Sequence, residues 1–282
     1  MERRKNSEER VCTSEWCYNE RHKQPDSRIM LERVCALLNK HTRFERLMNI
    51  TVIYPNKRKT KSVTFGIAHL VIDKLLCGGE LYEFYLPQDM PHVCVGCYAC
   101  FGGHPEKCGG YEYIKKIIEA MEKSDLVIFC SPSYVYHTPG QIKTLLDHFG
   151  YRWIVHSPDL SFMKKQALIV TSAAGGGMKS TVKDIKDSMN YWGVGKTHYI
   201  TQGVWGYDWN NMPDRFMKKI HKKVDRTVNK IQKLRGNVIP SIKVKAIFYI
   251  YRLFHKGRKM ADVDDNYWYK KGYVSGKPWK NK

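Results

Sequence analysis

Residues 124–148 read SDLVIFCSPSYVYHTPGQIKTLLDH and contain an apolar run, a polar turn and an amphipathic segment, in that order. The run 126–129 is apolar at every position, which is typical of a strand covered on both faces of a parallel sheet. Pro132 rigidifies the turn, and the segment 139–149 has apolar residues at helical spacing. This strand, turn and helix form the repeating unit of α/β proteins.

The same alternation extends in both directions from this stretch. Strands are expected at 50–54, 80–85, 125–130, 167–171 and 197–201, and helices near 62–76, 110–123, 139–149 and 178–192. Strands that alternate with helices predict a doubly wound α/β fold, a five-stranded parallel sheet with helices on both faces. We expect the flavodoxin-like strand order 2-1-3-4-5.

Charge and pattern divide the chain into three parts: a polar extension at 1–47, the α/β domain at 48–212, and a basic C-terminal part at 213–282. The net charge of +21 is uneven, because residues 214–282 carry 20 basic and 5 acidic side chains. A basic helix at 214–234, a break at 236–240, a second helix around 246–251 and an aromatic tail are expected there.

The role of the basic C-terminal part has two readings. A nucleic-acid or anionic-membrane anchor would use its positive charge. A helix packed on the domain, or across a dimer, would instead leave its lysines in solvent. We favour the packed helix over either anchor.

The cellular location is predicted from the absence of signal and membrane-spanning segments in the sequence. The opening MERRKNSEER has no apolar signal region, and no stretch is long enough to span a bilayer. Four cysteines within residues 94–108 suggest metal or redox chemistry in a reducing compartment. A cytoplasmic protein is expected. The sequence contains no Walker loop, no HExxH motif and no Ser–His–Asp order. Hydrolase and NTPase activities therefore have no support.

Ligands of such folds bind at the carboxyl ends of the strands, near the point where the strand order reverses. The loop after the first expected strand leads into a helix N-terminus, where free N–H groups favour a phosphate. Its hydroxyls and its arginine fit that role. The candidate phosphate-binding residues are Asn56, Arg58, Ser62 and Thr64. The alternative is a solvated turn with a helix cap.

Two later loops are expected at the same edge of the sheet. An exposed aromatic such as Tyr134 fits against a flavin ring, with backbone amides beside it. Three glycines at 175–177 permit a close approach of the backbone. The candidate residues of these loops are Ser131, Pro132, Ser133, Tyr134, Val135, Ala173, Ala174, Gly175 and Gly176. Packing at a strand end is the alternative for Tyr134 and, more strongly, for Tyr136.

The third feature is the run Cys94, Cys97, Cys100 and Cys108. Three thiols within seven residues fit one tetrahedral zinc poorly, because zinc is usually held by two separated pairs. Compact runs of four cysteines hold iron–sulfur clusters. We favour a 4Fe-4S cluster. Zinc, and unmetallated thiols with thiol–disulfide chemistry, remain alternatives.

Four stretches together resemble the NADPH-dependent FMN reductase-like branch of the flavodoxin superfamily, and within it the iron–sulfur flavoproteins. The resemblance covers roughly residues 48–205. It is carried by ITVIYPNKRKTKSVT, CVGCYACFGGHPEKC, SDLVIFCSPSYVYHTPGQIKTLLDH and TSAAGGGMKSTVKDI. It implies non-covalent FMN, with its phosphate at 56–64 and its ring between the loops 131–135 and 173–177.

The resemblance also implies the activity and the partners. An FMN-dependent oxidoreductase would take electrons from NAD(P)H, or from a ferredoxin, and pass them to an unknown acceptor. A homo-oligomer, dimer or tetramer, is implied as well. No catalytic side chain stands out. The alternatives are a flavodoxin-like electron carrier, which the basic charge disfavours, and an FMN protein anchored by its basic tail.

Overall fold

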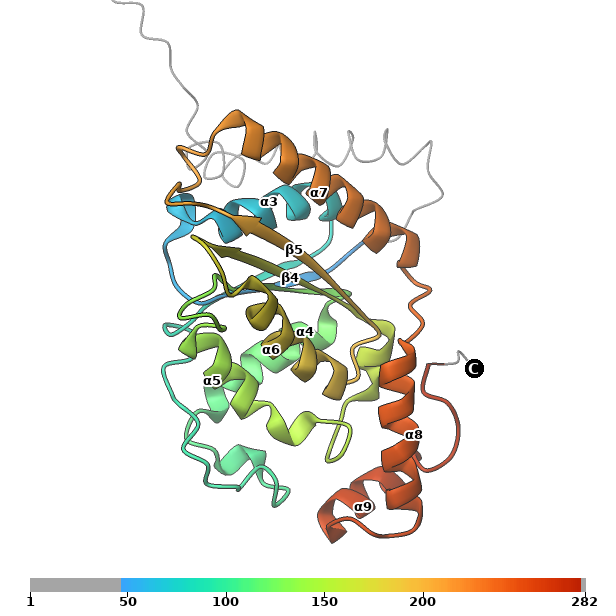
Figure 1. Ribbon diagram of the computed structural model, residues 1–282. Helices are drawn as coiled ribbons and strands as arrows, with labels where there is room; N and C mark the ends of the chain where they lie inside the picture. The colour runs from blue at the N-terminus through green and yellow to red at the C-terminus, as the bar shows by residue number, and fades with distance from the viewer. Residues whose placement is uncertain (1–46, 280–282) are drawn as a thin grey trace, which may run out of the picture. The chain divides into compact units, whose positions relative to one another are not determined.

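The computed structural model describes residues 47–279 of the 282-residue chain. The expected extension 1–47 therefore lies outside the described residues, apart from Leu47. The described residues lie in one compact unit. Its centre is a five-stranded parallel sheet (Figure 1).

The sheet has the predicted order β2-β1-β3-β4-β5. Every neighbouring pair of strands is parallel. The strands are β1 (Ile50–Tyr54), β2 (Leu81–Tyr85), β3 (Leu126–Cys130), β4 (Gln166–Ala173) and β5 (Lys196–Gly203). β1, β3 and β4 are buried along their whole length, which explains their apolar sequences. From His198 onward, buried residues of β5 alternate with exposed or half-buried ones, as expected of an edge strand.

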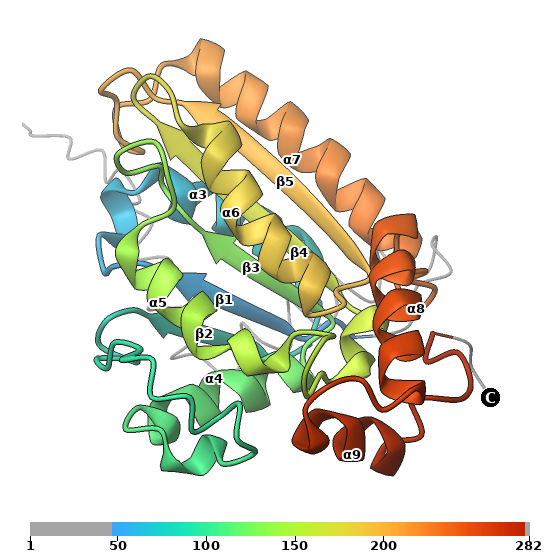
Figure 2. The same ribbon diagram turned by 60° about the horizontal axis from the view of Figure 1, so that its bottom comes forward.

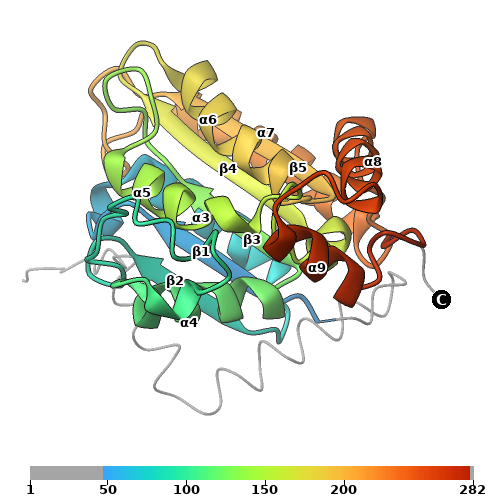
Figure 3. The same ribbon diagram turned by 90° about the horizontal axis from the view of Figure 1, so that it is seen from below.

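Helices cover both faces of the sheet (Figures 2 and 3). One face carries α3 (Val63–Leu75) and α7 (Asp214–Leu234), and their apolar residues share one hydrophobic cluster with β1, β3 and β4. The other face carries α4 (Tyr111–Lys123), α5 (Gly140–His148) and α6 (Met178–Tyr191), which share a second cluster. These helices lie where the sequence predicts them.

The ends of β4 and β5 differ from the prediction. The two strands pair up to Ala173 and Gly203, two residues beyond the predicted ends. Ala173 is therefore a buried strand residue rather than a loop residue. The extension exists because each strand supplies the other's backbone partners, which the sequence of either strand alone does not show.

The C-terminal part adds α8 (Ile242–Lys256) and a helix that the sequence did not predict, α9 (Asp262–Lys270). Trp268 of α9 and Phe248 of α8 are fully buried in a third cluster with Ile154 and Met163. The expected aromatic tail is thus part of a core. Within the described residues, no helix is long and apolar enough to cross a membrane.

Candidate functional site

We call the loops 55–62, 131–139 and 174–177 the carboxyl edge, because they follow β1, β3 and β4. The loops after β3, β4 and β5 lie together at the end to which the strand arrows point (Figure 2). Asn56 Nδ2–H donates to the hydroxyl oxygen of Tyr134 at 3.3 Å. This bond joins the first loop to the loop after β3.

The first loop has the geometry of a turn followed by a capped helix. The Arg58 N–H donates to Asn56 Oδ1 at 3.0 Å. Ser62 caps α3, since its Oγ accepts from the Phe65 N–H, and it lies 3.0 Å from Thr64 Oγ1. The Arg58 side chain is exposed, whereas Thr64 is buried. The four predicted phosphate-binding residues therefore surround one helix start, with only Arg58 fully open to solvent.

The loop after β3 continues the pairing with β4 and then turns sharply. The N–H groups of Ser131 and Ser133 donate to the carbonyls of Val170 and Ser172, each at 2.8 Å. Tyr134 and His137 exchange backbone hydrogen bonds of 2.9 and 3.0 Å around a two-residue turn. Both turn residues have a left-handed backbone, at φ 46° for Val135 and 67° for Tyr136. The Val135 side chain is 95% exposed, so the turn presents an apolar tip to solvent.

The glycine loop after β4 packs directly against this turn. Gly177 directly precedes α6 and has φ 91°, and a Cβ there would lie 2.6 Å from Tyr136 Cα and closer still to Ser133 Oγ. A Cβ on Gly176 would lie 3.1 Å from the Tyr136 ring. Only glycine allows this approach. Tyr136, rather than Tyr134, is therefore the aromatic residue that lies against the glycines.

Two buried hydroxyls near the carboxyl edge have no hydrogen-bond partner among the described residues. They belong to Ser133, in the loop after β3, and to Thr171, on β4. Buried hydroxyls are normally hydrogen-bonded, because a hydroxyl that loses its water partners without gaining a new one destabilises the folded state. Ser133 therefore offers an unused polar atom beside the place where the two loops meet, which fits a polar ligand there.

A fourth loop, 204–213, follows β5 and was not among the predicted site residues. The Trp209 indole lies directly against Gly66 of α3, so a side chain at Gly66 would not fit. Trp205 stacks on Phe216 of α7 with 5.5 Å between ring centres and remains 65% exposed. Two tryptophans directly after a strand were the signal that could have identified this loop.

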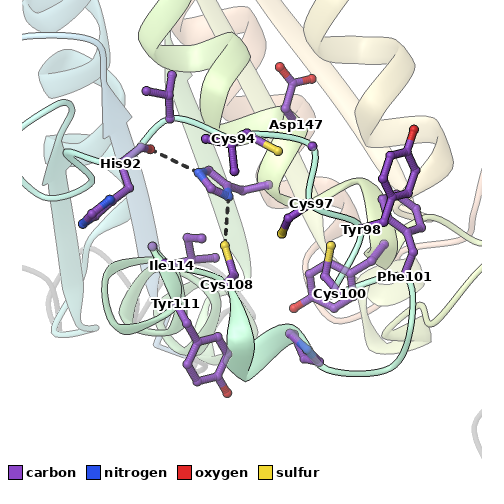
Figure 4. A pocket seen from close by; sticks show the side chains of 18 residues that line it. His92, Cys94, Cys97, Tyr98, Cys100, Phe101, Cys108, Tyr111, Ile114 and Asp147 are labelled. Atoms are coloured by element: carbon purple, nitrogen blue, oxygen red, sulfur yellow. Dashed lines mark hydrogen bonds between the residues drawn. The ribbon is translucent and has the colours of Figure 1, made fainter.

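The four predicted cluster cysteines line one pocket of about 390 Å³ (Figure 4). We call residues 94–108 the cysteine loop; it lies between β2 and α4. Figure 4 shows the sulfurs of Cys97, Cys100 and Cys108 facing the same space. Burial raises the pKa of the Cys100 thiol, and the nearby Cys108 and Cys94 add to that effect. All four cysteines of the loop, from Cys94 to Cys108, therefore line the same pocket.

His148, the last residue of α5, is buried and lines the same pocket. Its Nε2 lies 3.1 Å from the His92 carbonyl oxygen, and its Nδ1 lies 3.7 Å from Cys108 Sγ. Since a carbonyl only accepts, Nε2 carries the proton and Nδ1 faces the thiol. His148 therefore orients Cys108 from the end of α5.

The four thiols line one pocket without forming a ready-made site for a single metal ion. Across residues 47–279, no group of three or more His, Cys, Asp or Glu side chains is arranged to hold one metal ion. A cluster of several irons holds its four thiolates farther apart than one ion does, and it uses cysteine sulfur alone. Four thiols around one pocket are the donors that such a cluster needs.

The C-terminal part contacts the cysteine loop. The Phe101 ring meets His156 edge-on, with 4.7 Å between ring centres. His156 Nδ1 lies 2.9 Å from Oδ2 of Asp264, a buried residue of α9. A Cβ at Gly103 would lie 3.1 Å from a methyl group of Val263. α9 therefore supports the loop that carries the cysteines.

Comparison with known proteins agrees with this architecture. Residues 48–207 match the family model described as NADPH-dependent FMN reductase. A solved structure, an FMN-dependent NADH-azoreductase from Bacillus anthracis in complex with FMN, aligns with a TM-score of 0.50 and 13% identity. It covers 65% of this chain and 100% of that one. A likeness at this identity shows the fold alone.

Two curated relatives share a higher identity over shorter stretches. An iron-sulfur flavoprotein from Archaeoglobus fulgidus is 33% identical over 93 residues, which is 33% of this chain. Another, from Clostridioides difficile, is 34% identical over 104 residues, or 36% of this chain. The matched stretches span less than half of these relatives, 43% and 45%.

Proposed function

The chain belongs to the NADPH-dependent FMN reductase family, and we propose that it is an FMN-dependent NAD(P)H oxidoreductase of the iron–sulfur flavoprotein type. One observation carries the proposal: the carboxyl edge brings the predicted phosphate loop, the turn after β3 and the glycine loop together where the strand order reverses. We propose residues 48–212 as the flavin domain.

The start of α3 is the proposed phosphate site. The first N–H groups of a helix have no partner within the helix, and the helix dipole favours an anion there. The Ser62 and Thr64 hydroxyls and the Arg58 guanidinium are the side chains that would bind phosphate oxygens. The Asn56 side chain holds the turn through the Arg58 N–H and links it to Tyr134.

The turn after β3 and the glycine loop are the proposed ring site. The residues that would hold the ring are Ser131, Pro132, Ser133, Tyr134 and Val135 on one side and Ala173, Ala174, Gly175 and Gly176 on the other. The Ser133 hydroxyl is buried and has no partner in the described part of the chain, so it is available to a polar edge. Ala173 would contribute through its backbone, since its side chain is buried in β4.

Bound FMN would supply hydride and electron transfer, with NAD(P)H as the proposed donor. The chain's own part is to bind and orient. Left-handed backbone at Val135 and Tyr136 fixes the turn. His137 Nδ1 and the Thr138 N–H lie 3.0 and 3.1 Å from Asp184 Oδ2 of α6, which ties the turn to that helix.

The cysteine loop is the proposed site of a 4Fe-4S cluster. Cys94, Cys97, Cys100 and Cys108 share one pocket, and both curated relatives are described as iron-sulfur flavoproteins. A cluster would supply single-electron transfer. His148 would hold Cys108 in place, and Phe101 would hold the loop against His156.

The remaining parts of the proposal concern partners. A ferredoxin is a second proposed electron source, and the acceptor is not identified by these residues. We propose a homo-oligomer, dimer or tetramer, and a cytoplasmic location. The identity of the electron donor is a separate question from whether FMN binds.

The first experiment is a visible absorption spectrum of the full chain purified without oxygen, with iron and acid-labile sulfide assayed on the same sample. Flavin bands with about four irons and four sulfides per chain are expected. Flavin without iron would remove the cluster and leave an FMN reductase. A colourless chain that does not bind added FMN would refute the proposal as a whole.

A variant pair tests the cluster ligands. Cys97→Ser and Cys100→Ser should each lower the iron content to less than about half while FMN remains bound, because thiolates are the preferred cluster ligands. Cys130→Ala is the control, since Cys130 is buried in β3 outside the cysteine loop. Equal iron loss in all three variants would show that iron is held elsewhere.

An electron carrier without its own substrate is the alternative function. It is distinguished by steady-state oxidation of NADH and NADPH, which a carrier would not catalyse. Turnover with either nucleotide supports the oxidoreductase, and a chain that is reduced once but does not turn over with any electron donor supports the carrier.

A further inference from the structure

α8 has two apolar faces. Val244, Phe248 and His255 are buried against the domain. Ile242, Ala246, Ile250 and Leu253 are exposed, and their spacing of four, four and three residues places them together on the other side of the helix. We call these four residues the outer stripe.

The outer stripe is open to solvent to an unusual degree for large apolar side chains. Ile242 is 88% exposed, Leu253 72% and Ile250 52%, and Ile239 just before the helix is 67% exposed. Single exposed apolar residues are ordinary, but a continuous row of them on one helix marks an interaction surface. The packed inner face therefore does not account for the apolar character of α8.

Charge indicates what the outer stripe contacts. Residues 239–260 contain six Lys or Arg and no Asp or Glu. Helical spacing places Lys243 and Lys256 on opposite borders of the stripe. Lys243 Nζ also lies 3.6 Å from Asp187 Oδ1 of α6, in an ion pair that is open to solvent. An apolar row bordered by cations complements a surface that is anionic outside and apolar beneath.

Two other occupants fit these features less well. A second copy of the chain, related by a two-fold axis, would bring the same basic borders together, and like charges repel. A nucleic acid would attract the cations but would leave the apolar row in water. An anionic phospholipid bilayer satisfies both features, as basic amphipathic helices do at membrane interfaces.

We propose that the outer stripe of α8 docks the protein on the surface of an anionic phospholipid membrane. The helix would lie in the plane of the interface and insert Ile242, Ile250 and Leu253, while Lys243 and Lys256 meet lipid phosphates. The helix remains a surface element, because no helix of the described residues could cross a bilayer.

The position of α8 leaves the flavin site free. The Ser241 N–H, just before α8, donates to the Gly195 carbonyl at 3.2 Å, and Gly195 immediately precedes β5. α8 therefore begins at the amino end of β5, whereas the carboxyl edge lies at the opposite end of the strands (Figure 1). A protein docked through α8 keeps that edge open to solvent.

The experiment is sedimentation of the full chain with vesicles of phosphatidylcholine alone and with about 30% phosphatidylglycerol. Binding to the anionic vesicles, weakened by salt, is expected. The variant Ile242→Ser/Ile250→Ser/Leu253→Ser should lower the partition coefficient at least about tenfold. These side chains are exposed, so the far-ultraviolet circular dichroism should stay unchanged.

A matched pair of charge variants separates local docking from overall charge. Lys243→Gln/Lys256→Gln should lower binding at least about fivefold, because these lysines border the stripe. Lys219→Gln/Lys222→Gln removes the same charge from exposed positions of α7 and should lower it less than about twofold. Equal losses in the two variants would overturn the proposal.

Three further results would overturn it. One is a chain that does not bind anionic vesicles. Another is a wild-type chain that does not bind vesicles but forms an oligomer, seen by light scattering, which the stripe variant converts to monomers. The third is duplex DNA binding that the stripe variant leaves intact, again without vesicle binding. Vesicle binding requires neither flavin nor iron, so its failure leaves the proposed function untouched.

Discussion

Gly177, the N-cap of α6, has φ 91° and contacts the turn after β3. Because glycine has no side chain at this position, the glycine loop can contact the turn after β3. Its neighbour Gly175 has no atom within 4 Å of its would-be Cβ. The two glycines look alike in the sequence, yet the structure gives only Gly177 a contact that excludes a side chain.

Gly177→Ala should lower the free energy of unfolding by about 1–3 kcal/mol, because it combines a left-handed backbone with a clash against Tyr136. It should also weaken FMN binding by about tenfold, since the turn must shift. Urea unfolding and a flavin fluorescence titration measure the two effects. Gly175→Ala is the matched control and should leave both nearly unchanged. Equal effects from both variants would contradict the contact seen at Gly177.

At the scale of elements, polar side chains join strands to helices. His198 Nε2 of β5 lies 2.9 Å from Gln166 Oε1 of β4, and Gln166 Nε2–H donates to the Ile231 carbonyl of α7 at 3.0 Å. Burial, with Lys196 and Lys230 nearby, lowers the pKa of His198 to about 4. The folded chain therefore holds His198 neutral.

His198 should make stability depend on pH. The unfolded chain takes up this proton near pH 6.5 and the folded chain near pH 4, so stability is complete above pH 6.5 and falls as the pH drops between these values. The loss from pH 7.5 to pH 5 should be about 2 kcal/mol, measured by urea unfolding.

His198→Gln should flatten this pH dependence, and His221→Gln, at an exposed position of α7, should not. A His198→Gln chain that loses stability in acid as steeply as the wild type would show that other groups cause the loss.

α9 and the cysteine loop are a second pair of elements joined by polar and aromatic side chains. Asp264 is buried and paired with His156, which Phe101 of the loop meets edge-on. Asp262, in the same first turn of α9, is exposed. The two aspartates therefore differ in their contacts although they are two residues apart.

Asp264→Asn should lower the free energy of unfolding by about 1–3 kcal/mol, because it weakens a buried charge-assisted hydrogen bond. It should also raise the rate at which iodoacetamide alkylates Cys100, as the loop loosens. Asp262→Asn should change stability by less than about 1 kcal/mol and leave the alkylation rate unchanged. Alkylation that is the same in both variants would show that α9 does not support the loop.

At the scale of the whole molecule, the basic C-terminal part is built into the domain. Its buried Val244, Phe248 and Trp268 share a core with Ile154 and Met163, which lie between α5 and β4. The Trp268 indole N–H also donates to the His156 carbonyl at 2.9 Å. α8 and α9 should therefore unfold together with the sheet.

Trp268→Ala should lower the free energy of unfolding by about 3–5 kcal/mol, as expected when a fully buried aromatic side chain is removed. Thermal unfolding followed by circular dichroism should still show a single transition, shifted to lower temperature. Trp205→Ala, which removes a largely exposed indole, should cost less than about 1 kcal/mol. A separate early transition in Trp268→Ala would show that the C-terminal part folds independently.

The sequence by itself determined the sheet, its strand order and the helices that cover it. The apolar run 126–129, together with the helix-length segments between such runs, was enough to indicate a parallel sheet covered by helices, and the flavodoxin-like arrangement supplied the strand order. The order 2-1-3-4-5 then placed the loops after β1, β3 and β4 at one edge. The grouping of four cysteines also followed from their spacing alone.

Only the tertiary structure decided which residues meet across the chain. The contact of Gly177 with Tyr136, the support of the cysteine loop by α9, and the outer stripe of α8 each depend on elements far apart in the sequence. α9 was missed because its aromatic residues lack a clear helical pattern and are buried by distant partners such as Ile154. Periodicity shows that a face is apolar, but only packing decides whether that face is covered or left to a partner.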